Sequence, residues 1–232
     1  MKKISLCIPT WNRYEMLFES FANVINDERI SEIVIVDDAS DMDIYELVKQ
    51  RSALNPKITL YRNLTNQDCY TNKMIAASYA ENDFIILFDS DNILDTTYID
   101  RLYDFEDWDE GTIYAPSFAK PTFDYTAFNG LIVTKENVAD YMNEPMFTTC
   151  LNTANYFVNK KNYLSIWDGN IDPVTADSIF MAMNWLKAGN KIHIVEDLHY
   201  EHRVHPLSHY VNNNHRTGNL YNEIEQELKA LS

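Results

Sequence analysis

Glycine is scarce in this sequence: five of its 232 residues are glycine, and no two of them lie within four positions of each other. The Gly-x-Gly-x-x-Gly loop of dinucleotide-binding enzymes and the glycine-rich phosphate-binding loop both require closely spaced glycines. A dehydrogenase that uses the first loop and a nucleotide-binding protein that uses the second are therefore excluded. Any nucleotide must be held in another way.

Cysteines and long apolar runs are also few. The three cysteines, Cys7, Cys69 and Cys150, are far apart and form neither a Cys-x-x-Cys pair nor a recognisable disulfide framework, which favours a reducing compartment. The apolar run that starts at Ile4 is broken by Pro9, too early for a signal peptide, and no run reaches the length of a membrane span. We therefore expect a cytoplasmic protein without a membrane span.

Positive charge is limited, because 19 Lys and Arg residues stand against 35 Asp and Glu residues, giving a net charge of -16. Nucleic acids and anionic membranes are polyanions, so we expect neither as a partner. A small anionic ligand stays compatible with this balance, since a metal ion or a few basic groups can dominate the field inside a cleft.

Strand-like and helix-like segments alternate in the first half of the chain. This alternation predicts an α/β fold with a mostly parallel central sheet flanked by helices. The strands are expected at 4–8, 32–36, 58–61 and 84–88, and the helices at 14–24, 44–54 and 71–79. The second half is less regular, with strands expected at 112–115, 131–133, 155–158 and 191–195 and helices at 176–187 and 220–231. No repeat or linker divides the chain, so residues 1–232 are expected to form a single domain.

Three of the expected strands run directly into polar residues. These stretches are Pro9-Thr10-Trp11-Asn12-Arg13, Asp37-Asp38-Ala39-Ser40 and Asp89-Ser90-Asp91-Asn92. In an open parallel sheet, ligands bind outside the carboxyl ends of the strands. The sequence therefore predicts a binding site where the three stretches meet.

The aspartates in these stretches have two interpretations each. Asp89 and Asp91 are two positions apart, so in extended backbone both carboxylates face the same side, and a divalent cation would relieve their repulsion. Oxygen ligands suit Mg²⁺ or Mn²⁺; the alternative is a solvated turn or a helix cap. Asp37 and Asp38 can accept hydrogen bonds from a ribose hydroxyl or a base N–H, or can form an Asx-turn or cap before the next helix.

An ordered series of motifs resembles glycosyltransferase family 2, with its GT-A (nucleotide-diphosphosugar transferase) fold. The motifs are Ile8–Arg13, Ile33–Ser40, Asn72-Lys73, Phe84–Asn92, Asn155–Asp168, Ala176-Asp177 and Arg203–Ser208. They span roughly residues 3–210 of the chain. Ala176 stands where the family usually has an acidic residue, and the glycine common near Asn66 and Gln67 is missing.

The resemblance implies a role for each candidate residue. Asp177 would be the general base, with a helix-capping acidic residue as the alternative. Asp91 and Asp89 would bind Mn²⁺ or Mg²⁺, with His205 as a further ligand and His202 as its competitor. The nucleotide would be held by Pro9, Thr10, Asn12, Arg13, Asp37, Asp38, Asn72, Asp89 and Ser90.

The implied function is inverting transfer of a sugar from a nucleotide-diphosphosugar, first of all a UDP-sugar, to a hydroxyl acceptor. The acceptor would be carbohydrate, lipid-linked or protein, in polysaccharide or glycoconjugate synthesis. Residues 1–95 would form the nucleotide-binding half, 96–210 the acceptor-side half and 211–232 a C-terminal helix. The alternative is an inactive transferase fold that serves as a carbohydrate-binding or scaffold protein. A nucleotidyltransferase is disfavoured, because the first loop lacks the glycines such enzymes usually carry there.

Overall fold

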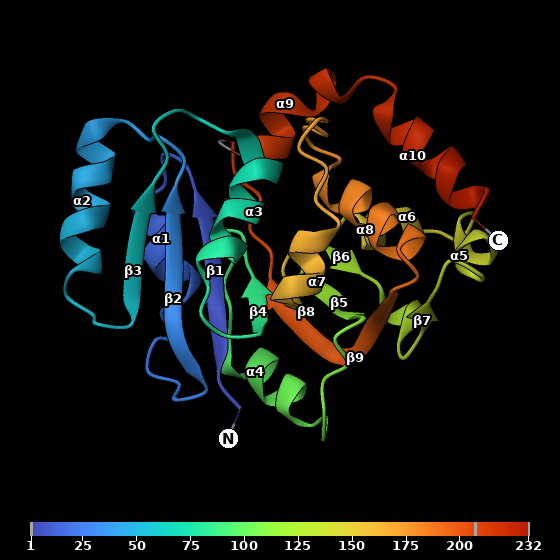
Figure 1. Ribbon diagram of the computed structural model, residues 1–232, viewed down its shortest axis with the longest axis horizontal. Helices are drawn as coiled ribbons and strands as arrows, with labels where there is room; N and C mark the ends of the chain where they lie inside the picture. The colour runs from blue at the N-terminus through green and yellow to red at the C-terminus, as the bar shows by residue number, and fades with distance from the viewer. Residues whose placement is uncertain (1, 207, 232) are drawn as a thin grey trace.

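The computed structural model describes residues 2–206 and 208–231, so Met1, Ser232 and Leu207 of the late motif lie outside the described residues. The first half forms four parallel strands in the order β3-β2-β1-β4 (Figure 1). They are β1 (Ile4–Thr10), β2 (Ile30–Asp37), β3 (Ile58–Arg62) and β4 (Phe84–Leu87). The connecting helices are α1 (Glu15–Ser20), α2 (Met42–Ser52) and α3 (Asp68–Tyr79). The strand and helix alternation expected here is confirmed.

The central strands are buried along their length. Every residue of β1 is buried, and so is β2 from Ile33 to Asp37. Strands that are covered on both faces have continuous apolar runs in the sequence rather than an alternating pattern. The strands of this half were predicted from such runs. α3 packs against β1 and β2.

The second half continues the same sheet, giving nine strands in all. The path β4-β8-β5-β9-β7 adds β5 (Thr112–Lys120), β7 (Ile132–Val133), β8 (Tyr156–Asn159) and β9 (Lys191–Glu201), and β6 (Phe123–Asp124) pairs with β5. β8 runs antiparallel to β4 and β5, whereas β5 and β9 are parallel. The α/β fold with a central sheet is confirmed, but the sheet is mixed rather than mostly parallel beyond β4.

Among the helices of the second half, the sequence pattern predicted α8 and α10 and missed α4, α5, α6, α7 and α9. The helical segments of this half are α4 (Thr96–Tyr103), the 3-10 turn η1 (Thr126–Phe128), α5 (Val138–Tyr141), α6 (Phe147–Leu151), α7 (Lys160–Ser165), α8 (Asp177–Lys187), α9 (His209–Thr217) and α10 (Leu220–Lys229). The expectation of one helix over 211–232 is wrong, because Gly218 at φ 57° separates α9 from α10. α10 packs on α8 and α5 through Ile224 and Leu228.

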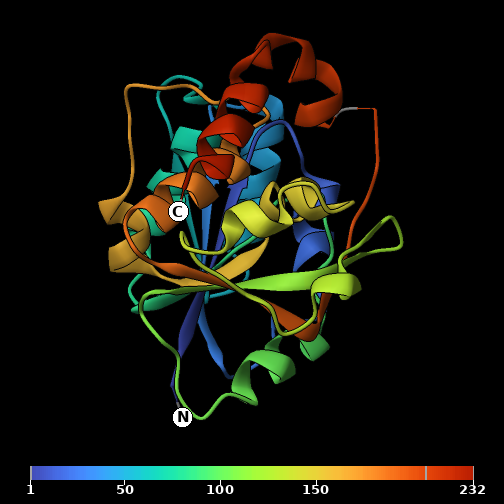
Figure 2. The same cartoon turned by 90° about the vertical axis from the view of Figure 1, so that its right-hand side faces the viewer.

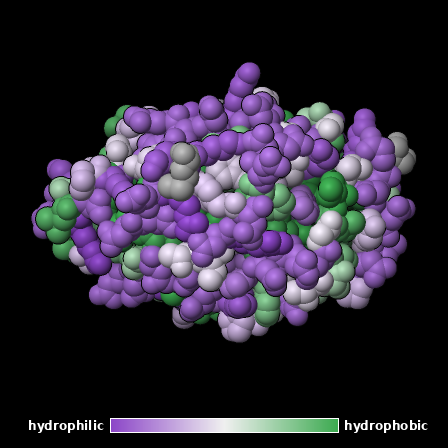
Figure 3. All heavy atoms as spheres, turned by 90° about the horizontal axis from the view of Figure 1, so that it is seen from below, coloured by the Kyte–Doolittle hydropathy of each residue, from purple (hydrophilic) through white to green (hydrophobic). Residues whose placement is uncertain are grey.

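One hydrophobic core joins the two halves. Ile8 and Leu87 of the first half belong to the same buried cluster as Phe157 and Trp185 of the second. Figures 1 and 2 show α9 beyond the carboxyl ends of the first strands, next to the beginning of α3. The face seen from below, at the opposite end, is mostly hydrophilic (Figure 3). Within the described residues, no helix combines the length and the apolar character that crossing a membrane requires.

Candidate active site

The three polar strand ends do meet at one edge of the sheet. Thr10 pairs with Asp37 in the β1–β2 register, and Asp38 N donates to Thr10 O at 2.8 Å. Asn12, at φ 51°, ties the first two loops together: its N–H donates to Ser40 Oγ and its Oδ1 accepts from Asp41 N, both at 2.8 Å. The Asn12 side chain therefore shapes this edge.

Asp37 and Asp38 have different surroundings. Asp37 is fully buried, and its Oδ2 accepts from Arg62 Nη1 at 3.0 Å and from Ser40 N, three residues on, at 3.1 Å, so it holds the loop in place. Asp38 Oδ1 accepts from Asn63 Nδ2 at 2.7 Å and from Gln67 N at 2.8 Å. Burial raises the pKa of Asp38 against these two hydrogen bonds.

Three other residues expected at the nucleotide are also part of the scaffold. Pro9 and Thr10 are buried at the end of β1. Asn72 is buried on α3, where its Nδ2 donates to Val36 O at 3.1 Å and its Oδ1 accepts from Asn63 Nδ2 at 3.0 Å. Asn63, which the sequence analysis missed, thus links Asn72 to Asp38.

The aspartate pair that follows β4 carries basic partners. Arg13 Nη2 lies 2.9 Å from Asp91 Oδ2, and Arg13 Nη1 donates to the buried Ser90 at 3.3 Å. His205 Nε2 lies 3.0 Å from the same Asp91 oxygen. Burial acts to raise the pKa of Asp91, but Arg13 and His205 outweigh it and hold that pKa below its usual value.

Lys73 connects this pair to the predicted base. Its Nζ lies 3.3 Å from Asp89 Oδ1 and 2.7 Å from Asp177 Oδ2. Burial raises the pKa of Asp89, and the nearby charges of Asp91 and Asp177 add to the effect of burial, against Lys73. Burial would lower the pKa of Lys73, but the two carboxylates outweigh it and hold that pKa well above its usual value. The sequence named Lys73 only as part of the Asn72-Lys73 motif, and its role was missed because the contact with Asp177 depends on the packing of α3 against α8.

Only one of the two competing histidines reaches the carboxylates. The His202 ring instead packs edge-on against Phe123, with 5.0 Å between ring centroids, and burial lowers its pKa. Arg203 is an anchor: its guanidinium donates to Asp91 O, to Met16 O and to Glu19. His205 is therefore the histidine at the aspartate pair.

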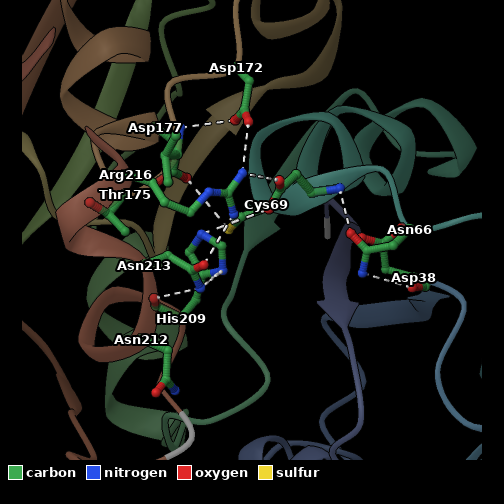
Figure 4. Close-up of polar contacts among 12 residues, drawn as sticks. Asp38, Asn66, Cys69, Asp172, Thr175, Asp177, His209, Asn212, Asn213 and Arg216 are labelled. Atoms are coloured by element: carbon green, nitrogen blue, oxygen red, sulfur yellow. Dashed lines mark hydrogen bonds and ion pairs between the residues drawn. The ribbon is translucent and has the colours of Figure 1, made fainter. Parts of the chain in front are cut away.

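α9 covers one side of this region. Arg216 Nη2 lies 3.5 Å from Asp68 Oδ2 and 3.6 Å from Asp172 Oδ2, and the hydroxyls of Thr217 and Thr175 are 2.6 Å apart. Asp68 has φ 65°, a conformation that aspartate tolerates better than most non-glycine residues. Figure 4 shows Arg216 and His209 pointing toward the beginning of α3, close to Cys69 and Asp177.

The donor set fits a divalent cation that is shared with a ligand. Within residues 2–206 and 208–231, no three His, Cys, Asp or Glu side chains are arranged to hold a metal by themselves. A Mg²⁺-type site normally takes one or two carboxylates and completes its shell with phosphate and water oxygens. Asp91 and Asp89 offer such carboxylates, and a cation beside them would relieve the like charges that raise the pKa of Asp89.

The mixed sheet with its polar carboxyl edge defines a GT-A glycosyltransferase fold, and solved structures of that fold resemble it. A mannosyltransferase from Pyrobaculum calidifontis, PcManGT, in complex with GDP-Man and Mn²⁺ matches 99% of this chain and 69% of its own at 15% identity, with a TM-score of 0.69. S. aureus TarS 1-349 in complex with UDP matches 96% of this chain and 65% of its own at 16% identity, with a TM-score of 0.64. These likenesses concern the fold.

The chain belongs to glycosyl transferase family 2, whose family model matches residues 5–162. A curated relative, the abequosyltransferase RfbV of Salmonella typhimurium, is 36% identical over 95 residues. That match covers 39% of this chain and 28% of the relative, so the chain matches about a quarter of RfbV. The expected family and fold are thereby confirmed.

Proposed function

We propose that this chain is an inverting glycosyltransferase that uses a divalent cation and moves a sugar from a nucleotide-diphosphosugar to a hydroxyl acceptor. The observation that carries the proposal is the arrangement of two carboxylates on either side of the Lys73 ammonium. Lys73 stands between Asp177, the base candidate, and Asp89, a metal candidate. A base and a leaving-group site would thus lie on either side of one buried ammonium.

The donor would lie along the edge formed by the first two strand ends. Asp38 is the candidate contact for the nucleoside, next to Thr10, while Asp37 and Asn72 keep the edge in shape. UDP and GDP are both donor candidates, because the neighbours TarS and PcManGT were solved with UDP and with GDP-Man. A UDP-sugar is our first choice.

Asp91 and Asp89 would hold Mn²⁺ or Mg²⁺, with His205 beside them. Such an ion, when bound, stabilises the charge that develops on a departing diphosphate. Arg13 can bind the same diphosphate through its planar donor fork. If His205 Nε2 joins the ligand set, Mn²⁺ is favoured over Mg²⁺, which takes oxygen ligands in near-ideal octahedral geometry.

Asp177 would take the proton from the acceptor hydroxyl. Lys73 donates a hydrogen bond to Asp177 Oδ2, so we assign Asp177 Oδ1 as the atom that accepts the proton of the acceptor hydroxyl. An acceptor oxygen activated on the face opposite the diphosphate attacks the anomeric carbon and inverts it. The base requires hydrogen-bond reach to that hydroxyl, which the position of Asp177 at the start of α8 would provide.

A donor panel tests the proposal. Release of nucleoside diphosphate is measured for UDP- and GDP-sugars with Mn²⁺ and with carbohydrate, lipid-linked and peptide acceptors. We expect Asp177→Asn to lower the transfer rate by about 100- to 10,000-fold, the usual contribution of a general base. The matched control is Asp140→Asn, which also removes an acidic residue from a first helical turn, in α5. Sugar binding without turnover of any donor would instead favour a non-catalytic carbohydrate-binding protein.

A further inference from the structure

Each carboxylate of the aspartate pair already has its own cation within the chain. Lys73 lies at Asp89, and Arg13 lies at Asp91. The two cations lie on different kinds of segment: Lys73 is on α3, also pairs with Asp177 and has a side chain that is 5% exposed, whereas Arg13 is in the loop after β1, also donates to Ser90 and has a side chain that is 17% exposed. Because Arg13 lies in a loop, its side chain can turn away from Asp91 without the movement of a helix.

Arg13 lies at the same atom that a divalent cation would need. Its Nη2 is 2.9 Å from Asp91 Oδ2, the oxygen that also faces His205 Nε2. A metal ion bound to that oxygen would repel the guanidinium, so the metal and Arg13 compete for Asp91. An arginine that leaves its carboxylate in a partly buried place loses a charge-assisted contact, and only another anion can replace it.

A nucleoside diphosphate supplies that anion. Its oxygens match the planar fork of a guanidinium, and they also complete the coordination of a divalent cation. We propose that Arg13 is the resident counter-cation of Asp91 and is exchanged for the metal when the diphosphate arrives, so that metal and nucleotide bind as a coupled pair. This inference rests on the proposed donor site, and it adds the residue that enforces the coupling.

The coupling has a thermodynamic signature that works in both directions. If nucleotide draws Arg13 away from Asp91, nucleotide tightens metal binding, and the metal tightens nucleotide binding by the same factor. Coupling between two sites is typically 5- to 150-fold, and we expect about 10-fold or more here. Removing the charge of Arg13 opens Asp91 to the metal in the absence of nucleotide, and it reduces the coupling to the part that direct contact between the diphosphate and the ion supplies.

The test counts free Mn²⁺ by electron paramagnetic resonance, with and without saturating UDP, for the wild type, Arg13→Gln and Arg13→Lys. We expect Arg13→Gln to bind Mn²⁺ alone about 3- to 10-fold more tightly than the wild type, and its gain in Mn²⁺ affinity from UDP to be smaller than the wild-type gain by about the same factor. Arg13→Lys, which keeps the charge, is expected to retain weak binding of Mn²⁺ alone. The control Arg101→Gln removes an equal charge from an Arg–Asp pair on α4 and should behave as the wild type.

Two results overturn the inference. One is Mn²⁺ binding to Arg13→Gln alone that is no tighter than to the wild type. The other is a gain from UDP that is the same in Arg13→Gln and the wild type. If neither UDP nor GDP binds any variant, the proposed donor site fails, but the comparison of Mn²⁺ binding without nucleotide still decides whether Arg13 competes for Asp91. A thermal melt of each variant verifies that it is folded.

Discussion

Lys73 Nζ lies 2.7 Å from Asp177 Oδ2, joining α3 of the first half to the start of α8 in the second across 104 positions of sequence. The same nitrogen lies 3.3 Å from Asp89 Oδ1. A single buried ammonium thus compensates two carboxylates from different segments. Its removal would affect the stability of the chain as well as the geometry of the candidate site.

We predict that Lys73→Met lowers the free energy of unfolding by about 3–5 kcal/mol, the usual cost of breaking a buried ion pair by removing one partner. The cause is the uncompensated charge of Asp177 and Asp89. Urea denaturation followed by circular dichroism measures the loss. The double variant Lys73→Met with Asp177→Asn should recover part of it, and Lys73→Arg should lose less, because its charge is kept. Unchanged stability of Lys73→Met would show that the bridge does not contribute.

Asp38→Asn is predicted to raise stability at neutral pH while weakening nucleotide binding. The folded protein holds the pKa of Asp38 above its usual value, chiefly through burial. Its contribution is therefore fully present below the unfolded pKa of about 4 and is lost as pH rises through the folded pKa. The amide carries no charge to desolvate and can still accept at Oδ1. Melting temperatures from pH 4 to pH 8 should show a gain that grows with pH.

Asp27→Asn serves as a comparison in which the change in stability at neutral pH is expected to have the opposite sign. The hydrogen bond from Arg29 lowers the pKa of Asp27. Its contribution is present above the unfolded pKa and is lost as pH falls through the folded pKa. This variant should be less stable than the wild type at neutral pH, with the difference shrinking in acid. If Asp38→Asn lowers stability at pH 7, as Asp27→Asn is expected to do, the burial argument for Asp38 is wrong.

Substitution of His205 and substitution of His202 should have different effects on metal-dependent nucleotide binding. His205→Ala is predicted to weaken Mn²⁺-dependent binding of UDP by about 10-fold or more, in the range seen when groups that support a metal site are removed. His202→Ala should change it by less than about 2-fold, because His202 packs on Phe123. Titration calorimetry with Mn²⁺ present makes the comparison. An equal loss in both variants would remove His205 from the proposed ligand set.

Loosening α9 should leave global stability nearly unchanged. The pairs of Arg216 with Asp68 and Asp172 are partly exposed, and exposed ion pairs contribute about 0–1 kcal/mol. Arg216→Gln should therefore speed amide hydrogen exchange in α9 without a comparable change in α8. Mass spectrometry of deuterated peptides measures both helices. Exchange that stays unchanged in α9 would mean that these pairs do not hold the helix down.

How much the sequence predicts depends on whether an element buries a regular apolar pattern. β2 and β4 were predicted because both are almost wholly buried, and buried strands leave continuous apolar runs. α9 was missed because none of its residues is buried, so it lacks the stripe of core-facing apolar residues that marks a helix in a sequence. The insertion of the late strand β8 between β4 and β5 depends on pairing between distant segments, which no local pattern encodes.

In the candidate site too, some features follow from local sequence patterns and others depend on contacts between distant segments. Their spacing directly after an apolar strand singled out Asp89 and Asp91, and the structure brings Arg13, Lys73 and His205 to them. Spacing could not separate Asp37 from Asp38, since only the fold shows that Arg62 binds Asp37. The position of Lys73 between two carboxylates arises from packing of α3 against α8, and the sequence holds no sign of that contact.

The most direct test of the account is a calorimetric titration of UDP, with and without Mn²⁺, into the wild type and Asp91→Ala. Asp104→Ala, which changes an exposed aspartate that pairs with Arg101, is the matched control. We predict micromolar binding that requires Mn²⁺, is lost in Asp91→Ala and is kept in Asp104→Ala. If UDP, and then GDP, fails to bind the wild type with Mn²⁺ present, or binds Asp91→Ala equally well, the proposed donor site is contradicted.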